Sequence, residues 1–439
     1  MIDIKQLREN PELYKKNARN KFRNPEIVDA VLTIDSKWRK LKLEADNLRS
    51  KRNKISEEIN NAKKSGKNAD SLIKMAKEIP QKLIGIERDE KETYDRIKLE
   101  IVKIPNLMSK KVPIGKDDSE NVAEKFFGKI KKVNFEIKSH VEIAENLGVA
   151  DFESSRRVSG TGFYYLEGEL ALLNAALINY ARGIMVKKGF RYVETPLMLK
   201  NEIIDNVVDL NDQEKMIYRI SNDNASLIGT SEHSLIGRFA EQEIEERRLP
   251  IKHTSYSMCF RKEVGGKGID EKGLYRTHQF NKIEMIVICK PEESEKFYEE
   301  LNSITIEIFK GLEIPIRILK ICSGDLGDLK YEQIDVEAYS PRKKGYFEVG
   351  SCSNLTDAQA RKLGISTRIK GERVVPHTLN NTAIATSRAL VAILENHQQK
   401  DGSVKIPKAL WKYTGFKEIR KKEVKKKILK GKKMKGRKK

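Results

Sequence analysis

Residues 259–284 read CFRKEVGGKGIDEKGLYRTHQFNKIE, two strand-like runs joined by a charged, glycine-rich loop. Side chains of equal parity lie on one face of a strand. If the two runs pair as a hairpin, one surface therefore collects Arg261, Glu263, Arg276, Phe280 and Glu284. Such a surface can hold a polyanion, a flat base and an ammonium group together. The alternative is a core phenylalanine beside a surface ladder of charges.

The chain has 439 residues, of which 38% are hydrophobic and 34% charged, so we expect a multidomain protein. No run reaches the roughly 18 apolar residues of a membrane span, and the first residues lack the apolar segment of a secretory signal. The four cysteines and six histidines include no close pairs spaced for zinc. We therefore expect a cytoplasmic protein with no membrane contact, no zinc and buried, reduced cysteines.

The positive charge gathers at the C-terminus. The net charge is +22, and residues 417–439 contain 14 Lys and Arg against 2 Glu. This composition predicts a disordered basic tail. A tail that serves solubility or localisation and a tail that holds RNA are equally compatible with it.

Residues 27–104 follow a heptad pattern that predicts an antiparallel helical hairpin. The apolar positions of the first helix are Ile27, Val31, Ile34, Trp38, Leu41, Ala45, Leu48, Ile55, Ile59 and Ala62, with a polar break at Arg52. The return helix carries Leu72, Ala76, Ile79, Leu83, Ile86, Ile97, Ile101 and Ile104, with a weak middle stretch and an expected kink at Pro80. One apolar stripe per helix cannot form a globular core. The hairpin is therefore either a dimerising coiled coil or an arm that reaches a large partner.

After a polar connector over 105–160, the pattern predicts an α+β domain with a largely antiparallel sheet and flanking helices. Helices are expected over 167–188 and 383–397. Strand-like runs are expected over 190–193, 254–263, 276–288, 331–339 and 346–352. The predicted division is an N-terminal coiled-coil arm (1–110), a catalytic domain (111–416) and the basic tail (417–439).

No glycine-rich phosphate loop of the P-loop or dinucleotide-binding type is present. If the protein uses ATP, arginines must hold the phosphates, and the candidates are Arg261, Arg276 and Arg388. Guanidinium groups match phosphate geometry and remain charged.

The run from Phe260 to Glu284 resembles motif 2 of class II aminoacyl-tRNA synthetases, in the form typical of the seryl-tRNA synthetase family. Other segments resemble this family in the same order. Residues 188–196 resemble motif 1, which builds the family's dimer interface; 230–232 resemble its serine-binding Thr-x-Glu; 348–354 resemble its second ATP segment; 379–396 resemble motif 3; and 1–12 resemble its start. The resemblance covers residues 1 to about 416 and implies the class II fold.

The resemblance also implies roles for individual residues. Those for serine are Thr230, Ser231, Glu232, Arg261, Glu284 and Thr382. Those for ATP are Arg261, Lys262, Glu263, Arg276, Thr277, Phe280, Glu348, Val349, Gly350, Ser351 and Arg388. Arg261, Glu284 and Arg388 are the implied catalytic residues, and Glu348 with Ser351 would bind Mg²⁺, which prefers hard oxygen ligands.

Within this set, Arg261 would bridge the α-phosphate and the serine carboxylate, and Phe280 and Arg388 would enclose the adenine. The pair Glu284 and Thr382 would hydrogen-bond the serine hydroxyl. A site built to bind a hydroxyl rejects analogues that lack it.

Two residues depart from the family pattern without removing a needed group: Lys262, and Ser231 in place of the usual alanine.

The implied activity is that of a zinc-free seryl-tRNA synthetase, working as a homodimer with ATP, L-serine and tRNA(Ser) as substrates. Charging of tRNA(Sec) is left open. The arm would grip the tRNA, with Arg49, Lys51, Arg52 and Lys54 as candidate phosphate contacts. The alternatives are a ligase that loads an amino acid onto a carrier protein, against which the arm argues, and a non-enzymatic coiled-coil RNA-binding protein.

Overall fold

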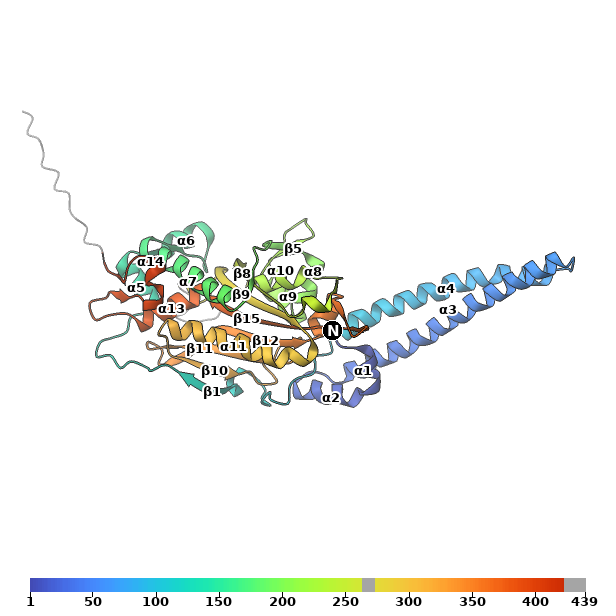
Figure 1. Ribbon diagram of the computed structural model, residues 1–439, viewed down its shortest axis with the longest axis horizontal. Helices are drawn as coiled ribbons and strands as arrows, with labels where there is room; N and C mark the ends of the chain where they lie inside the picture. The colour runs from blue at the N-terminus through green and yellow to red at the C-terminus, as the bar shows by residue number, and fades with distance from the viewer. Residues whose placement is uncertain (263–272, 422–439) are drawn as a thin grey trace, which may run out of the picture.

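A computed structural model describes residues 1–262 and 273–421. A helical arm projects from a body built around one large sheet (Figure 1). Glu263, most of the loop in the opening hairpin and most of the basic tail lie outside the described residues. Among the described residues, no helix is long and apolar enough to cross a bilayer. All four cysteines are buried and free, as expected for small core residues.

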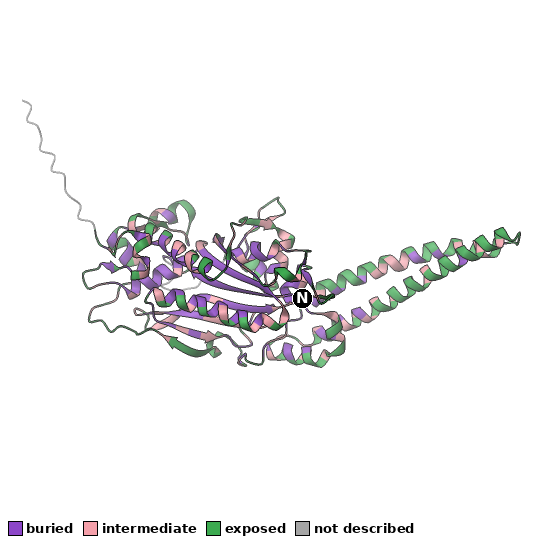
Figure 2. Ribbon diagram, viewed as in Figure 1, coloured by how far each residue is buried: buried purple, intermediate pink, exposed green. Residues whose placement is uncertain are grey.

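The arm is the predicted antiparallel hairpin of α3 (Glu26–Lys64) and α4 (Asp70–Ile101). All the predicted seam positions are shielded from solvent except Arg52, the polar break, which is exposed. At 1.5 Å rise per residue, the 39 residues of α3 span about 58 Å. Figure 2 shows exposed residues along most of the arm, so only its narrow seam is covered.

The weak stretch of the return seam is filled by polar residues. Thr93 is buried and Glu90 is half-buried, so they continue the heptad spacing between Ile86 and Ile97. The expected kink at Pro80 does not interrupt α4. The ring of Pro80 is exposed, while Ile79 is buried in the seam on α3, and this packing keeps the helix continuous.

The root of the arm packs against α1 (Ile4–Glu9) and α2 (Pro11–Asn20). Asp35 of α3 is 1% exposed and accepts hydrogen bonds from Arg8 at 2.8 and 2.6 Å and from Arg39 at 3.1 Å. A buried charge held by two guanidinium groups in this way fixes α3 against α1.

Several polar groups join this root to the body, among them the side chains of Asn106 and Lys21. The Asn106 amide donates to the carbonyls of Leu329 and Leu355, at 3.1 and 3.0 Å. The Lys21 amine, wholly buried, donates to the carbonyls of Lys330 at 2.8 Å and Gly327 at 3.3 Å. Burial lowers the pKa of Lys21 to about 7, although nearby aspartates raise it.

This lowered pKa predicts a pH-dependent contribution to stability. Between about pH 7 and the ordinary lysine pKa of 10.5, the unfolded chain binds a proton that the folded chain does not. Stability should therefore rise with pH, by up to about 1.4 kcal/mol per unit from this group. We expect the melting temperature to rise between pH 7 and 9 more in the wild type than in Lys21→Met. Equal pH dependence in the two proteins would contradict the prediction.

The body is built on an eight-stranded sheet. In spatial order its strands are β1 (Val122–Phe127), β10 (Ile316–Lys320), β11 (Glu332–Ser340), β12 (Gly345–Thr356), β15 (His377–Ala385), β9 (Gln279–Cys289), β8 (Ile251–Phe260) and β4 (Arg191–Tyr192). All neighbours pair antiparallel except β4 and β8, which are parallel. The prediction of a largely antiparallel sheet is confirmed.

The two faces of the sheet have different covers. The odd-numbered residues of β9 from Ile283 to Cys289 join the main core with α7 (Gly168–Lys187), α11 (Ser294–Gly311) and α13 (Thr386–Asn396). On the opposite face, Ile286 and Ile288 pack with α8 (Asn201–Val207) and α10 (Ser231–Gly237). The remaining even-numbered residues, including Phe280 and Glu284, are free to form a site.

Shorter elements complete the body. They are α5 (His140–Leu147), α6 (Phe152–Ser159), α9 (Leu210–Met216), α12 (Ala358–Lys362), α14 (Trp411–Thr414), β2 (Ala150–Asp151), β3 (Tyr165–Leu166), β5 (Met198–Lys200), β6 (Ala225–Leu227), β7 (Glu243–Ile244), β13 (Ser366–Ile369), β14 (Glu372–Val374), β16 (Val404–Lys405) and β17 (Glu418–Ile419). Those before Ser159, with β1, give the 105–160 connector its expected mixture of strand and helix.

Several predicted boundaries are wrong. The helix predicted over 383–397 is α13, which begins at Thr386 because residues 377–385 form β15 between β9 and β12. The hairpin strands are shifted: β8 covers Ile251–Phe260 and β9 begins at Gln279. In each case, pairing with neighbouring strands decides the boundary over local sequence preference.

Candidate active site

The opening hairpin forms with the register that its parity requires. Cys259 lies opposite Phe280, and Arg261 N donates to the His278 carbonyl at 2.9 Å. The Arg261 guanidinium lies 5.5 Å from the centre of the Phe280 ring. Glu284 lies further along the same face of β9. The predicted surface is thus present for Arg261, Phe280 and Glu284.

A cavity of about 220 Å³ opens on this surface. Its lining includes the predicted Arg261, Arg276, Thr277, Phe280, Glu348, Val349, Gly350, Thr382 and Arg388, together with Tyr275, Lys282, Ala385 and Ser387. The predicted ATP residues of three distant segments therefore meet around one space. Three arginines and an aromatic ring give this cavity the chemistry of a nucleotide site.

Arg388, from the first turn of α13, is fixed by Glu348 of β12. Its Nη1 donates to the carboxylate and to the backbone carbonyl of Glu348, both at 2.9 Å. Burial opposes ionisation of Glu348, but the charge and hydrogen bond of Arg388 outweigh it and lower the pKa of the carboxyl. The Tyr275 ring lies 5.4 Å from the Arg388 guanidinium carbon, so Arg388 is held from two sides.

A larger cavity of about 1080 Å³ adjoins the first. The two share the lining residues Arg261, Lys282, Glu348 and Thr382. The larger cavity also contains the predicted Thr230, Glu232, Glu284 and Ser351. The two spaces therefore meet at Arg261, where a phosphate in one and a carboxylate in the other could both be held.

Glu284 lies at the centre of a buried polar group. It is 1% exposed and stands opposite Thr382 in the pairing of β9 with β15. Thr230 Oγ1 donates to its Oε2 at 3.1 Å, and Lys282 forms an ion pair with the same oxygen. Glu284 and Thr382, predicted to contact one hydroxyl, are thus direct cross-strand neighbours.

Glu232, in the first turn of α10, supplies a second carboxyl group. Its Oε1 accepts hydrogen bonds from Gln359 at 3.0 Å and from Asn380 at 2.9 Å. Burial, with the Glu284 carboxylate, raises the pKa of Glu232 to about 7. An incoming ammonium group would favour its ionised form.

Asp335 of β11, Glu348 and Ser351 form a second cluster of oxygen-bearing side chains. It lies opposite Ser351 in the sheet and accepts from the Gln333 amide at 2.7 Å. Burial and the Glu348 carboxylate raise the pKa of Asp335 to about 7. Within 1–262 and 273–421, no three His, Cys, Asp or Glu side chains converge as a metal site. In this cluster, the side chains that could bind a metal ion are the two carboxylates of Asp335 and Glu348 and the hydroxyl of Ser351.

Two predicted site residues point elsewhere. The Ser231 hydroxyl donates to the Ser255 carbonyl at 3.3 Å, and the Lys262 amine lies 5.9 Å from the centre of the Tyr218 ring. Neither lines the two cavities. Any contact of their side chains with substrate would require a rearrangement.

Several residues that complete the site were not predicted from the sequence: Tyr275, Lys282, Asp335, Gln359 and Asn380. For Lys282 the signal was available, since it has the parity of Phe280 and Glu284 in one strand. Asp335 could be found only once the register of β11 against β12 was known.

Comparison with known proteins assigns the class and then the family. Residues 215–397 match the tRNA synthetase class II core domain (G, H, P, S and T), so the body is a class II aminoacyl-tRNA synthetase domain. Residues 1–108 match the seryl-tRNA synthetase N-terminal domain. A serine–tRNA ligase of Methanoregula boonei is 42% identical over 424 residues, which cover 95% of this chain and 100% of that protein. The chain therefore belongs to the seryl-tRNA synthetase family, the serine–tRNA ligases.

Solved structures agree with this assignment. Seryl-tRNA synthetase from Pyrococcus horikoshii, complexed with ATP, superposes with a TM-score of 0.92 at 40% identity and covers 96% of this chain and 100% of that one. Cytoplasmic serine–tRNA ligase from Naegleria fowleri, in complex with AMP, gives 0.88 at 29% identity, covering 96% and 99%. The predicted class II fold with a helical arm is confirmed.

Proposed function

We propose that this site condenses L-serine with ATP to seryl-adenylate and then transfers the seryl group to the 3′ end of tRNA(Ser). The meeting of the two cavities at Arg261 carries the proposal. It places the smaller, arginine-rich cavity with its aromatic ring beside the part of the larger cavity that contains Glu284 and Thr382. The ATP in the Pyrococcus horikoshii relative supports a nucleotide in the first of these spaces.

Arg261 would act directly on the reacting groups. A serine carboxylate oxygen attacks the α-phosphorus of ATP, a new P–O bond forms, and the bond to the bridging oxygen breaks to release diphosphate. The Arg261 guanidinium would align the two anions and stabilise the negative charge that grows on the phosphoryl oxygens. Its Nε already donates to the Gly229 carbonyl at 3.2 Å, and this hydrogen bond helps to orient the guanidinium group.

The remaining cavity residues would hold ATP. Phe280 would stack on one face of adenine, Arg388 would flank the other and reach the γ-phosphate, and Arg276 would bind the bent phosphate chain. Asp335, Glu348 and Ser351 fit Mg²⁺, because hard oxygen donors suit this ion and because a bound cation would relieve the repulsion by which the Glu348 carboxylate raises the pKa of Asp335. Bound Mg²⁺ would neutralise charge on the phosphates.

The polar pocket would select serine. Glu284 and Thr382 would bind the hydroxyl, and Glu232 with Thr230 would receive the ammonium group. Alanine cannot form the hydrogen bonds that Glu284 and Thr382 would make with the serine hydroxyl, and a site built to bind a hydroxyl can reject such an analogue by a factor of about 10⁴–10⁵. Threonine would have to be excluded by size.

The raised pKa of Glu232 predicts how serine binding depends on pH. Below about pH 7 the carboxyl is largely protonated and cannot pair with the ammonium group. We expect KM for serine to fall about fivefold to tenfold from pH 6 to pH 7.5, following the ionised fraction. Glu232→Gln should raise KM and flatten this dependence. A Gln variant with the wild-type pH profile would contradict the assignment.

Two assays test the proposed function. Purified protein should catalyse serine-dependent ATP–diphosphate exchange far above a Glu284→Ala control, and it should charge total tRNA with serine alone among the amino acids. Exchange without any tRNA charging would favour the carrier-protein ligase. Absence of both activities would favour the non-enzymatic RNA-binding protein, although the match over residues 1–108 favours neither alternative.

The arm would contact tRNA(Ser), and the motif 1 segment would contact a second copy of this chain. The arm would grip tRNA(Ser) by shape and backbone contacts, although Arg49 is already paired with Asp46 and Glu87. A homodimer would form around α7 and β4. Exposed apolar side chains near this segment are Leu172, Val186, Leu197 and Met198. The cytoplasm is the proposed location.

A further inference from the structure

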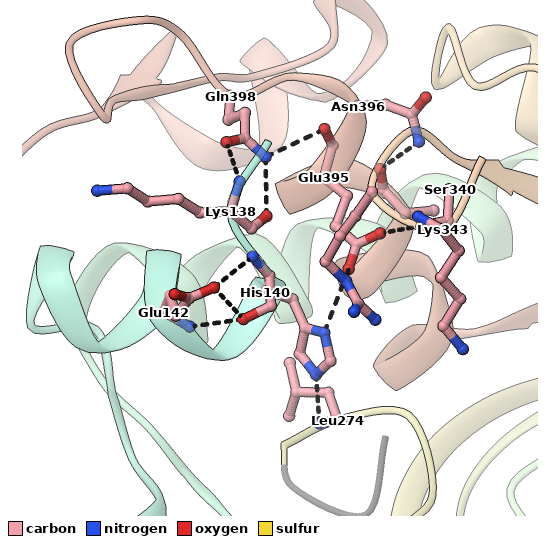
Figure 3. A network of polar contacts seen from close by, with 12 residues as sticks. Lys138, His140, Glu142, Leu274, Ser340, Lys343, Glu395, Asn396 and Gln398 are labelled. Carbon is pink, nitrogen blue, oxygen red and sulfur yellow. Dashed lines mark hydrogen bonds and ion pairs between the residues drawn. The ribbon is translucent and has the colours of Figure 1, made fainter. Parts of the chain in front are cut away.

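Behind the nucleotide cavity, a buried histidine connects three separate elements (Figure 3). His140, the first residue of α5, is 3% exposed. Its Nε2 lies 3.2 Å from the Leu274 N–H, and its Nδ1 lies 3.5 Å from Glu395 Oε1. Because Nε2 accepts the hydrogen bond from the backbone, the ring proton is on Nδ1 and points toward the carboxylate.

Glu395, near the end of α13, is held as an ionised acceptor. The Ser340 hydroxyl donates to its Oε2, and Arg342 Nε donates to Oε1 at 3.3 Å. Burial would raise the pKa of Glu395, but the contact with His140, the hydrogen bond from Ser340 and the nearby Arg342 charge outweigh burial and lower it. The carboxylate therefore fixes the orientation of the imidazole.

The backbone that carries His140 is also fixed. Gln398 accepts from the Lys138 N–H at 3.0 Å and donates to the Lys138 carbonyl at 3.1 Å. Ser139 caps α5 through a reciprocal pair of hydrogen bonds with Glu142. The imidazole is thus held at both its backbone and its Nδ1, which leaves Nε2 as a rigid acceptor.

The segment whose Leu274 N–H donates to His140 Nε2 leads directly into the nucleotide cavity. Gly273, at φ +92°, lies against the ring so closely that a Cβ would come within 2.4 Å of His140 Nε2. After Leu274, the next three residues, 275–277, all line the cavity. Tyr275 also packs on the Arg388 guanidinium. A shift at Leu274 would therefore move both Arg276 and the support of Arg388.

We propose that His140 is a positioning residue for ATP, acting through Leu274 to hold Tyr275, Arg276 and Thr277 at the nucleotide. This inference rests on the proposed binding of ATP in the smaller cavity. His140 touches no lining of the serine pocket, so its effect should fall on ATP and leave serine binding unchanged. Glu395 supports the effect by orienting the ring.

Two conservative variants separate the two contacts of the imidazole, the Leu274 hydrogen bond at Nε2 and the Glu395 contact at Nδ1. In His140→Gln the amide can place an acceptor near the position of Nε2 and keep the Leu274 bond. In His140→Asn the amide lies near the position of Nδ1, faces Glu395 and leaves the Leu274 N–H unpaired. A buried donor without a partner is costly. We expect KM for ATP in diphosphate exchange to rise about tenfold in His140→Asn and less than threefold in His140→Gln, with KM for serine within twofold in both.

His397→Asn is the matched control, because His397 is also buried and bonds the Leu312 carbonyl at 2.9 Å, away from the cavity. It should leave KM for ATP unchanged while lowering the melting temperature. Equal ATP constants in wild type, His140→Gln and His140→Asn would overturn the proposal, as would equal losses for ATP and serine. Calorimetric titration of each variant with MgATP gives the same comparison without turnover. If the wild type binds ATP but shows no exchange, the result counts against the proposed function. The His140 proposal is then tested by the calorimetric titration alone.

Discussion

Arg261→Ala should lower kcat for serine-dependent ATP–diphosphate exchange by about 10²–10³-fold, the usual cost of removing one donor to a developing negative charge. Arg261 stands where the two cavities meet, so its loss removes the group expected to contact both reacting anions. The melting temperature should change little, because the Arg261 side chain is only half-buried. Steady-state exchange kinetics and a thermal melt measure the two effects.

Two variants calibrate this result. Arg261→Lys keeps the charge without the planar fork, so it should recover only a small part of the activity. Arg368→Ala removes an exposed arginine that pairs with Glu243, remote from the cavities, and should retain wild-type kinetics. An Arg261→Ala enzyme within fivefold of wild type would remove Arg261 from the proposed mechanism.

Shortening the arm should separate the two half-reactions. The rings of Trp38 and Tyr94 contact each other across the hairpin, with their centres 5.4 Å apart. Residues 40–92 can therefore be replaced by a flexible linker of about four residues. This cut retains Asp35 and the apolar root beneath it. We expect exchange within threefold of wild type and aminoacylation of tRNA reduced at least 100-fold, since the proposed tRNA grip is lost.

The exchange activity serves as the internal control for folding of the body. Loss of exchange along with charging would mean that the arm supports the catalytic domain. Retention of full charging would mean that the arm does not hold the tRNA. Circular dichroism should register the removal of helix in either case.

Local periodicity predicted much of this architecture. The heptads gave the seam of the arm, because one stripe per helix leaves a clear spacing in the sequence. Strand parity gave the shared surface of Arg261, Phe280 and Glu284, because hairpin pairing is local and its register follows from alternation. The family resemblance then placed residues from distant segments around one cavity, where the structure brings most of them together.

The errors come from contacts that are distant in sequence. The last three residues of β15, 383–385, read locally as the start of a helix, and pairing of β15 between β9 and β12 makes them part of a strand. Asp335 joins the cluster of oxygen-bearing side chains through the register of β11 against β12. Thr93 occupies a seam position that a search for apolar residues passes over. His140 and Leu274 are more than 130 residues apart, and no local pattern connects them.

The joint at the root of the arm gives one short segment of backbone two duties. The carbonyls of Gly327 and Lys330 accept from the Lys21 amine on one side. On the other side the same segment walls the larger cavity. The arm is therefore structurally coupled to the larger cavity through residues 327–330. An arm transplanted from a relative must therefore be transferred with both its root and the matching segment 327–330. Without them, the new arm would project in a different direction and distort the larger cavity.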